Sequence, residues 1–409
     1  MKPHNKKYIA LSFLFILFCL VIQPIKGHDY DMYCWLEWTK YIQQNSLGNA
    51  YANGSIDYPP LYLYFLNLFG SCIGSPEGIQ NKIHFLKSIT MVFHLLTGYF
   101  LMIWIKRQNQ SWDNALHNTL FYIFNICILY NGIIWGQVDI IMTFFIFLSC
   151  YFCFLKKTTP SLIFFILAIN FKIQSIIFLP IIGLMLLPVI IDTFSIKNIL
   201  KWIFIPVIVQ LLILLPFILS GTIGNLLDVI KNSFGKYPFV SMNAYNFWHL
   251  TVPGDLMTIQ DSTKFSIFTY KQWGLLLFFT TSFFALFPLM KQSYLSIKNR
   301  TYFSYPLSKF LLVCSLIPLL FFYFNTQMHE RYCHPAFAFL IAYSLYSKKY
   351  ILSIIGGLTY LLNLEGVLHF MQLPNYGTAI FNKKIISVLF AIIVFLMYIA
   401  LFKPKKKLI

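Results

Sequence analysis

The sequence predicts an all-α protein that crosses a membrane many times, and three observations support this fold class. Hydrophobic residues make up 58% of the 409 residues and charged residues only 11%, whereas a typical soluble domain has roughly 25% charged residues. Long uncharged apolar runs recur along the chain, and about 20 such residues let a helix cross the hydrocarbon layer. The runs show no polar–apolar alternation, so helices are predicted rather than the strands of a membrane barrel.

Hydropathy predicts about twelve transmembrane helices in a single membrane-embedded domain, residues 1–409. The first apolar run follows three lysines and lacks a small-residue cleavage site, so it is expected to stay as a span. The fifth and sixth runs are short and are joined without a clear loop. The expected spans are residues 8–25, 85–105, 116–134, 138–155, 161–173, 174–190, 201–220, 273–290, 307–326, 333–347, 350–370 and 383–402.

Residues 60–75 offer a choice between a further span and a helix on the membrane surface. Their apolar run has only about 14 residues, which is short for a span. Without a crossing there, 19 of the 31 Lys and Arg residues fall on the side of both termini and 12 on the other side. The positive-inside rule therefore predicts cytoplasmic termini and an interfacial helix at residues 60–75, inside a long first outer loop.

The charge distribution and the cysteines exclude other classes of protein. The net charge of +18 would suit a nucleic-acid-binding protein, but no soluble basic domain is present to carry it, so no nucleic-acid partner is expected. Most of the eight cysteines, such as Cys127 and Cys314, lie inside apolar runs and are interpreted as buried hydrophobic residues. Eleven of the 13 acidic residues fall on the predicted outer side, which also holds the long loops 26–84 and 221–272.

The first outer loop begins with two carboxylates, Asp29 and Asp31, followed by an aromatic stretch from Tyr33 to Trp38. Two interpretations remain open at this point. The stretch suits a solvated loop with an interfacial aromatic belt, and it also suits a general base with a helper acid at the membrane surface. The loop ends at Asp57–Pro60, where Asp57 is either a helix-start residue or a site residue.

Four further polar clusters fall at the outer ends of spans or, for one of them, in the long outer loop 221–272. They are Trp135-Gly136-Gln137-Val138-Asp139, Asn170-Phe171-Lys172, the stretch Pro238–His249 with Asn243, Asn246 and Trp248, and Gln327–Pro335 with His329, Glu330, Arg331 and His334. A lysine ammonium at the depth of Lys172 is paired, functional or snorkelling to the surface. An arginine such as Arg331 suits phosphate, because a guanidinium donates two parallel hydrogen bonds. The two histidines are a weak metal pattern, so no metal or other cofactor is expected, and a divalent metal is the alternative.

The combination of motifs resembles the GT-C superfamily of polytopic glycosyltransferases, which use polyprenyl-phosphate-linked sugars. The segment from Asp29-Tyr30-Asp31 to Trp35-Leu36-Glu37 is similar to the catalytic loop of that superfamily. Asp57-Tyr-Pro-Pro-Leu61, Asn170-Phe-Lys172 and His329-Glu-Arg331 look like motifs of dolichol-phosphate-glucose-dependent glucosyltransferases. Trp135–Asp139, Asn243–Trp248 and Met328–Tyr332 resemble bacterial proteins related to the second mannosyltransferase of glycosylphosphatidylinositol assembly. The resemblance covers roughly residues 1–350.

The resemblance implies a membrane hexosyltransferase that acts with inversion on the outer or luminal side. It would move mannose or glucose from a polyprenyl-phosphate donor to a lipid-linked or glycan acceptor. Asp29 is the expected base and Asp31 the second candidate. The expected donor-phosphate residues are Arg331, His329, Glu330 and Lys172, and the expected substrate-binding residues are Asp57, Tyr58, Trp135, Gln137, Asp139, Asn243, Asn246 and Trp248.

Two other functions remain as alternatives. A transporter or flippase of lipid-linked sugars needs polar residues on both faces, whereas the predicted cytoplasmic loops are short and carry no polar clusters like those of the outer face. A polymerase or ligase that moves a whole glycan often carries a larger outer soluble domain, and the sequence contains no such stretch.

Overall fold

The computed structural model describes residues 3–25, 27–108, 111–233 and 235–403. Within these residues the chain is helical apart from one antiparallel hairpin, β1 (Lys264–Phe265) with β2 (Phe268–Thr269). The predicted all-α class is therefore confirmed. The α-helices are α1 (Pro3–Ile22), α2 (Asp29–Asn45), α3 (Pro60–Ile73), α4 (Pro76–Lys82), α5 (Leu86–Lys106), α6 (Trp112–Ile123), α7 (Ile126–Leu129), α8 (Asp139–Phe154), α9 (Thr158–Phe171), α10 (Leu179–Asp192), α11 (Ile196–Leu219), α12 (Ile223–Asn232), α13 (Trp248–Thr251), α14 (Tyr270–Lys298), α15 (Leu307–Phe324), α16 (His334–Ser347), α17 (Ile351–Leu368) and α18 (Lys383–Phe402). Shorter helical segments are the 3₁₀ turns η1 (Leu47–Asn49), η2 (Ile83–Phe85), η4 (Ile173–Phe178) and η5 (Ala379–Phe381), and the π-helical η3 (Tyr130–Trp135).

Several helices are long and apolar enough to cross a membrane. In the described part of the chain, seven segments qualify: Pro76–Lys106, Ile173–Asp192, Ile196–Leu219, Tyr270–Lys298, Leu307–Phe324, Ile351–Leu368 and Lys383–Phe402. The pair Trp112–Ile123 and Ile126–Trp135, bent by 49°, would make an eighth. Helices also cover the other predicted spans, as α1, α8, α9 and α16, but these fall outside that class. The protein is thus a multi-pass helical membrane protein, and the number of about twelve spans stays a prediction.

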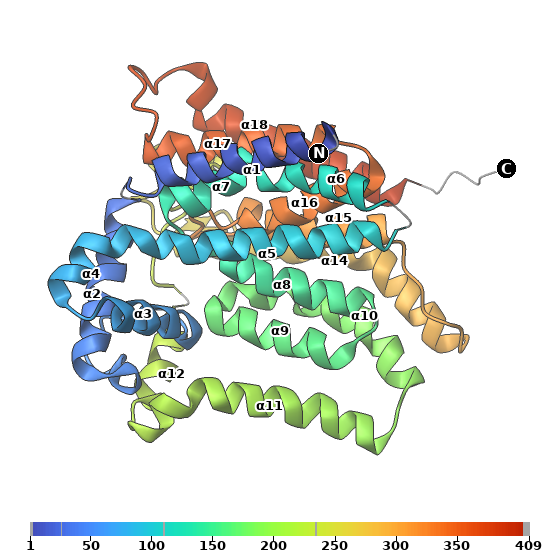
Figure 1. Ribbon diagram of the computed structural model, residues 1–409. Coiled ribbons are helices and arrows are strands. Elements are labelled where there is room, and N and C mark those ends of the chain that lie inside the picture. The colour runs from blue at the N-terminus through green and yellow to red at the C-terminus, as the bar shows by residue number, and fades with distance from the viewer. Residues whose placement is uncertain (1–2, 26, 109–110, 234, 404–409) are drawn as a thin grey trace.

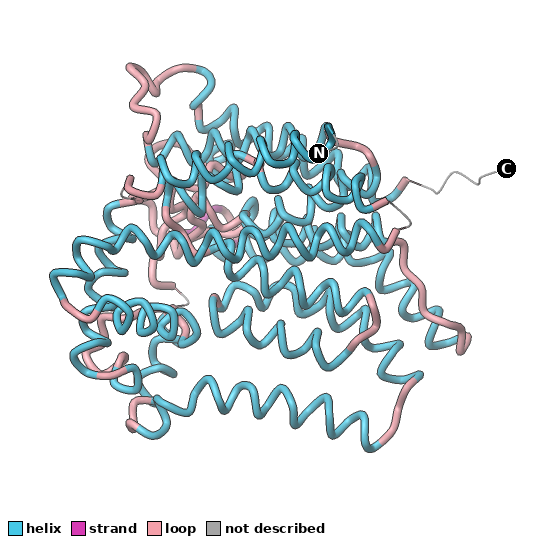
Figure 2. Tube along the Cα trace, in the orientation of Figure 1, coloured by secondary structure: helices cyan, strands magenta, loops and turns pink. Residues whose placement is uncertain are grey.

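The long helices lie side by side along one common direction (Figure 1). Helices α2, α3, α4 and α12 gather at one end of this bundle, which is called the site end below (left in Figure 1). The end of α18 lies at the opposite end (Figure 1), and many loops of the site end are seen behind α7 and α5 (Figure 2). The 14-residue α3, which covers residues 60–73, packs on α2 and does not reach spanning length.

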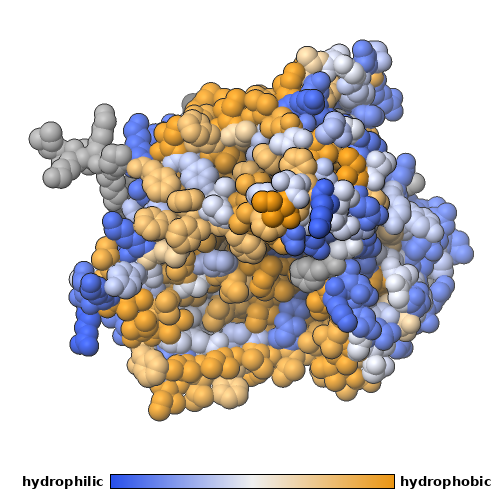
Figure 3. All heavy atoms as spheres, turned by 180° about the vertical axis from the view of Figure 1, so that it is seen from behind, coloured by the Kyte–Doolittle hydropathy of each residue, from blue (hydrophilic) through white to orange (hydrophobic). Residues whose placement is uncertain are grey.

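The helices differ sharply in how much of their surface is covered by the rest of the protein. The apolar window of α15 is 78% buried, whereas that of α11 is only 17% buried. Large apolar side chains such as Phe204, Leu212 and Leu219 of α11 are exposed. Apolar residues cover much of the face seen from behind, including the lower edge that α11 forms (Figure 3). An exposed apolar surface of this extent is what a lipid-facing surface requires.

Local sequence signals set the elements that surround the site. Pro60 begins α3 with Pro59 before it, because a proline is preorganised for the first helical turn and lacks only an N–H that would go unpaired. Thr269 and Gln272 form a capping box at the start of α14. Gly27 lies so close to Trp135 that an added Cβ would be 2.3 Å from its carbonyl oxygen. This close approach lets the His28 N–H donate to the Trp135 carbonyl at 2.7 Å, so α2 starts directly beside η3.

Candidate active site

A cavity of about 580 Å³ opens at the site end of the bundle. Its wall combines residues from the long loops 26–84 and 221–272, from η3 and η4, and from the segment before α16. The two long loops are called the first and second outer loops after their predicted side. The lining includes His28, Tyr30, Asp31, Cys34, Trp35, Trp38, Asp57, Tyr58, Trp135, Lys172, Gln174, Lys236, Tyr237, Asn243, Lys271, Gln327, His329, Glu330, Arg331 and Tyr332. A second part of the lining is apolar and consists of Ile173, Ile176, Ile177, Leu275, Phe321 and Val367.

Asp31 is the carboxylate that α2 presents to this cavity. Its Oδ2 accepts a hydrogen bond from Trp135 Nε1 at 2.9 Å and lies 3.1 Å from His28 Nδ1. Burial alone would raise the pKa of Asp31, but the charge of Arg331 and the contacts with His28 and Trp135 hold it well below its ordinary value. Asp31 is therefore an ionised acceptor at neutral pH, and its orientation is set by the Trp135 donor and the close contact with His28.

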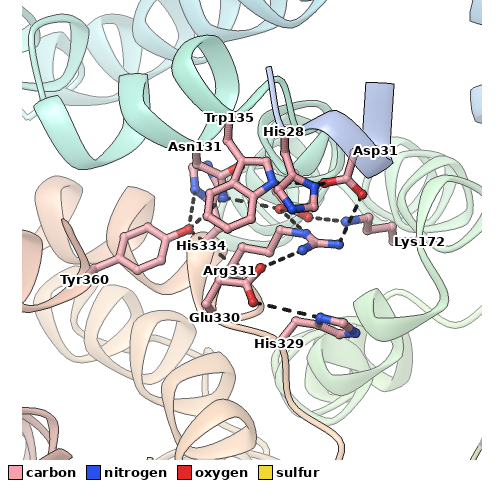
Figure 4. A network of polar contacts seen from close by, with 11 residues as sticks. His28, Asp31, Asn131, Trp135, Lys172, His329, Glu330, Arg331, His334 and Tyr360 are labelled. Atoms are coloured by element: carbon pink, nitrogen blue, oxygen red, sulfur yellow. Dashed lines mark hydrogen bonds and ion pairs between the residues drawn. The ribbon is translucent and has the colours of Figure 1, made fainter. Parts of the chain in front are cut away.

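Arg331 is the centre of a buried charge network (Figure 4). Its Nη1 donates to Glu330 Oε1 at 2.6 Å, its Nη2 lies 3.8 Å from Asp31 Oδ1, and its Nε lies 4.0 Å from Asp139 Oδ2. The Nε–H itself has no hydrogen-bond partner within the described residues. A guanidinium that lines a cavity with a free donor is suited to a bound anion.

Lys172 and Asp139 form a buried ion pair behind Arg331. Asp139 is fully buried at the first residue of α8, and its Oδ2 also accepts from Asn131 Nδ2 at 3.2 Å. Asn131 in turn donates to the Tyr360 hydroxyl at 2.7 Å, so the pair is tied to α17. Buried charges are tolerated when they are paired and hydrogen-bonded in this way. The sequence left open whether the Lys172 ammonium is paired, functional or snorkelling to the surface, and the structure shows that it is paired.

The segment that carries Arg331 is held by the second outer loop. The Met242 N–H donates to the Met328 carbonyl at 2.9 Å, and the Gln327 N–H donates to the Phe239 carbonyl at 3.0 Å. Asp261, 2% exposed, accepts from the Thr326 hydroxyl at 2.8 Å and from Gln327 Nε2 at 2.7 Å. Backbone pairing and a buried carboxylate therefore fix the position of the segment before α16.

His329 and Glu330 flank Arg331 in the cavity wall, where the side chain of His329 is 15% exposed and that of Glu330 is buried. His329 Nδ1 lies 3.9 Å from Glu330 Oε2. Burial, reinforced by the charge of Arg331, lowers the pKa of His329 to about 3, so the imidazole is neutral at neutral pH. Burial raises the pKa of Glu330, and Arg331 opposes that rise.

The structure brings most of the sequence-predicted site residues together. Those in the cavity wall are Asp31, Asp57, Tyr58, Trp135, Lys172, Asn243, His329, Glu330 and Arg331, and Asp139 lies directly behind them. Asp57 does not cap α3 but pairs with Lys236 of the second outer loop. Asp29 is exposed at the start of α2 and is not part of the cavity lining.

Three predicted substrate-binding residues lie outside the cavity lining. Asn246 is buried and its Nδ2 donates to the Phe322 carbonyl at 3.1 Å. Trp248 is 1% exposed and its Nε1 donates to the Phe324 carbonyl at 3.0 Å. Both side chains therefore secure the second outer loop to the end of α15. Gln137 is fully buried, lies outside the cavity lining, and finds no side-chain partner among the described residues.

Two lysines of the cavity wall, Lys236 and Lys271, were missed by the sequence reasoning. Lys236 pairs with Asp57. Lys271 is exposed at the second position of α14 and, unlike Lys172, Lys236 and Arg331, has no carboxylate partner in the described part of the chain. Lys236 lies in a loop of mixed composition and Lys271 in the first turn of α14, and no motif marks either lysine.

The described residues contain no group of three or more His, Cys, Asp or Glu side chains arranged to bind a metal ion. His334, considered with His329 as a candidate ligand, is buried with its Nδ1 3.3 Å from the Tyr360 hydroxyl. Compared with known families and with curated proteins, the chain matches no family model and no curated sequence.

Proposed function

We propose that this protein is an inverting membrane glycosyltransferase that moves a hexose, mannose or glucose, from a polyprenyl-phosphate donor to a lipid-linked or glycan acceptor. The observation that carries the proposal is the make-up of one cavity. A carboxylate, Asp31, and a guanidinium, Arg331, lie 3.8 Å apart in its wall, and an apolar wall runs beside them. The GT-C resemblance of the motifs supports the same reaction.

The apolar part of the wall suits the lipid tail of the donor. Ile176 of η4 is 42% exposed and Leu275 of α14 is 40% exposed, although both line the cavity. We infer that the cavity opens toward a lipid-facing surface between these two elements. A polyprenyl chain can remain in the hydrocarbon along this wall while its phosphate reaches the cations.

The cations of the wall suit the donor phosphate. Arg331 lines the cavity with a guanidinium that keeps its charge when buried, and Lys172, which also lines the cavity, adds a second positive charge. Lys271 lies one helical turn before Leu275 on α14, so the two side chains share a face. This spacing puts a free ammonium next to the apolar wall, at the point where a phosphate would join its lipid tail.

The proposed reaction is a single displacement at the anomeric carbon. The acceptor hydroxyl oxygen forms a bond to the anomeric carbon as the bond from that carbon to the phosphate oxygen breaks. The hydroxyl proton moves to an Asp31 carboxylate oxygen, and the electron pair of the broken bond leaves with the polyprenyl phosphate. Because this leaving group is stable as an anion, only one carboxylate is needed, whereas glycoside hydrolysis uses two. Arg331 stabilises the charge that develops on the phosphate.

Asp31 takes the role that the sequence suggested first for Asp29. The two residues are separated by two positions on α2, so they point to different sides of the helix. Asp31 lines the cavity and Asp29 does not. The ion pair with Arg331 weakens Asp31 as a base, and a donor phosphate that draws the guanidinium away from Asp31 restores its basicity.

Purified protein in lipid nanodiscs, incubated with polyprenyl-phosphate mannose or glucose and a mixture of lipid-linked and free glycan acceptors, tests this function. Transfer of the hexose with inverted anomeric configuration, read by NMR of the product, is the expected result. The same donors, used with the protein in proteoliposomes, distinguish sugar transfer from the alternative function as a flippase. Movement of the sugar lipid between leaflets with its glycosidic bond intact, and no transfer to any acceptor, would establish a flippase and overturn the proposal.

A further inference from the structure

Trp35 lies in the cavity wall with a buried polar atom that the protein leaves unpaired. The side chain is 2% exposed, and its Nε1–H has no acceptor within the described residues. Other tryptophans of this region use that donor: Trp135 donates to Asp31 and Trp248 to the Phe324 carbonyl. Buried polar groups are normally paired, so an orphaned donor in a cavity wall indicates a ligand that supplies the acceptor.

The surroundings of Trp35 define the chemistry of that ligand. Its ring meets the Tyr58 ring edge-on at 5.0 Å and the Trp38 ring at 5.1 Å, and these two rings lie 5.5 Å apart. All three side chains line the cavity. This aromatic corner offers apolar ring surface together with polar N–H and O–H groups, of which the Trp35 N–H is buried and unpaired within the described residues, and this combination suits an amphipathic ring bearing hydroxyl groups.

The position of Trp35 along α2 relates this corner to the proposed reaction. Trp35 follows Asp31 by four residues, so the two side chains are neighbours on one face of the helix, with Cβ atoms about 5–6 Å apart. A hexose ring that contacts the aromatic corner therefore lies next to Asp31, the proposed base. No charged side chain is needed to bind such a ring.

We propose that Trp35 determines sugar specificity by donating its Nε1–H to a hydroxyl group of a hexose bound in the aromatic corner. The inference rests on the proposed function and adds the residue that recognises the sugar. The hexose belongs either to the donor lipid or to the acceptor glycan, and both present the same hydroxyl chemistry.

The test compares Trp35→Phe with Trp104→Phe. Trp104 is a matched control because it is also 2% exposed with an unpaired Nε1, yet it lies in α5 outside the cavity lining. Each variant in nanodiscs is titrated with polyprenyl-phosphate mannose or glucose and with polyprenyl phosphate that carries no sugar. We expect W35F to bind the sugar-bearing lipid about fivefold to tenfold more weakly, the effect of one neutral hydrogen bond. Binding of the sugar-free lipid is expected to stay unchanged in both variants.

A second arm separates the two sources of the hexose. If donor binding is unchanged in W35F but the KM for the acceptor rises by a similar factor, the recognised ring is that of the acceptor, and the proposal stands. A second replacement, benzothienylalanine at position 35, exchanges the N–H for sulfur and keeps the fused ring, so it serves if W35F folds poorly.

Three outcomes overturn the inference. Wild-type transfer with unchanged donor affinity and acceptor KM in both Trp35 replacements would remove Trp35 as the specificity residue and leave the proposed function standing. An equal loss in W104F, or an equal loss for the sugar-free lipid, would mark the effect as structural. A wild-type protein that neither binds nor transfers any of the sugar lipids would overturn the inference and the proposed function together.

Discussion

Nη2 of Arg331 lies 3.8 Å from Oδ1 of Asp31 in the wall of the same cavity. The guanidinium and the carboxylate come from distant parts of the chain, the segment before α16 and the start of α2. Their proximity means that any anion bound by Arg331 changes the electrostatic surroundings of Asp31. Donor binding and base strength are therefore coupled in the proposed mechanism, and donor should bind before the acceptor is deprotonated.

Replacing Asp31 by Asn should abolish sugar transfer, because the amide cannot take the acceptor proton. The expected loss is on the order of 10²–10⁴-fold in kcat, the usual contribution of a positioned base. Asp29→Asn is the control on the same helix, and it should retain activity within about threefold, since single exposed substitutions have small effects. Transfer rates for both variants in nanodiscs check the assignment. Loss of activity in D29N with activity kept in D31N would return the base to Asp29.

Arg331→Lys keeps a positive charge but removes the planar donor set that contacts Glu330 and faces Asp31 and Asp139. We expect the KM for the donor to rise at least tenfold, because a lysine cannot contact a phosphate bidentately. Arg331→Gln leaves the acidic partners unpaired, and loss of one partner from a buried network costs roughly 3–5 kcal/mol. The apparent Tm of the purified variants should fall further for Gln than for Lys. A Gln variant as stable as wild type would contradict the central role of Arg331 in this network.

Lys271→Gln tests whether the lysine without a carboxylate partner captures the donor phosphate. Because Lys271 is exposed and makes no ion pair with any described residue, its loss should leave the Tm unchanged. The KM for the donor should rise severalfold with kcat unchanged, and the difference from wild type should shrink in high salt as screening increases. Lys264→Gln, an exposed lysine of the same loop outside the cavity lining, provides the control. Equal effects of the two substitutions would show that only the net charge of the loop matters.

The stability effects of substituting Lys172 and Asp139 should be strongly coupled, because removing either side chain leaves the other buried without its main partner. Lys172→Met and Asp139→Asn are each expected to destabilise the protein. The double variant should be less destabilised than the sum of the single effects, with a coupling of about 1–3 kcal/mol in a double-mutant cycle. Thermal unfolding in detergent, followed for all four proteins, measures this coupling. Additive losses would mean that the two side chains do not stabilise one another.

Acidification should destabilise the segment that carries His329. The pKa of His329 is lowered to about 3, from an ordinary value of 6.5, mainly by burial. Between these two values the unfolded state binds a proton that the folded state excludes, so this residue makes stability rise with pH across that window. The Tm of the wild type should therefore drop more than that of His329→Gln when the pH is lowered from about 7 to about 4.5. Parallel drops in both proteins would argue against a buried neutral imidazole.

The helical class could be predicted because a long apolar run in lipid must form a helix, whatever its neighbours are. The choice between Asp29 and Asp31 as the base could not be predicted from the sequence. They differ in the side of α2 on which they lie, and which side meets the cavity depends on how α2 packs beside η3. Gly27, which allows that close approach, carries no sign of its role in the sequence.

The polar residues of the second outer loop were harder to assign than the carboxylates. Asn246 and Trp248 were predicted to bind substrate, yet their donors reach backbone carbonyls at the end of α15. An amide or indole looks the same in the sequence whether its acceptor is a ligand or the backbone. Lys271 is the opposite case, a residue of the cavity wall that was not predicted. Whether it has a carboxylate partner depends on residues far from it in the chain, which the local sequence does not show.

Helices α8 and α9 contain 16 and 14 residues, so they rise about 24 Å and 21 Å. The hydrocarbon layer is about 30 Å thick. Lys156 and Lys157 connect the ends of α8 and α9 that lie away from the site, and such charged side chains anchor helix ends at the membrane–water boundary. The shortfall therefore falls at the site, where Asp139 begins α8 and Lys172 follows α9. Fourteen of the 16 residues of α8 are buried, so neighbouring helices rather than lipid surround this short helix. The protein itself therefore encloses the polar end of α8, where Asp139 meets Lys172.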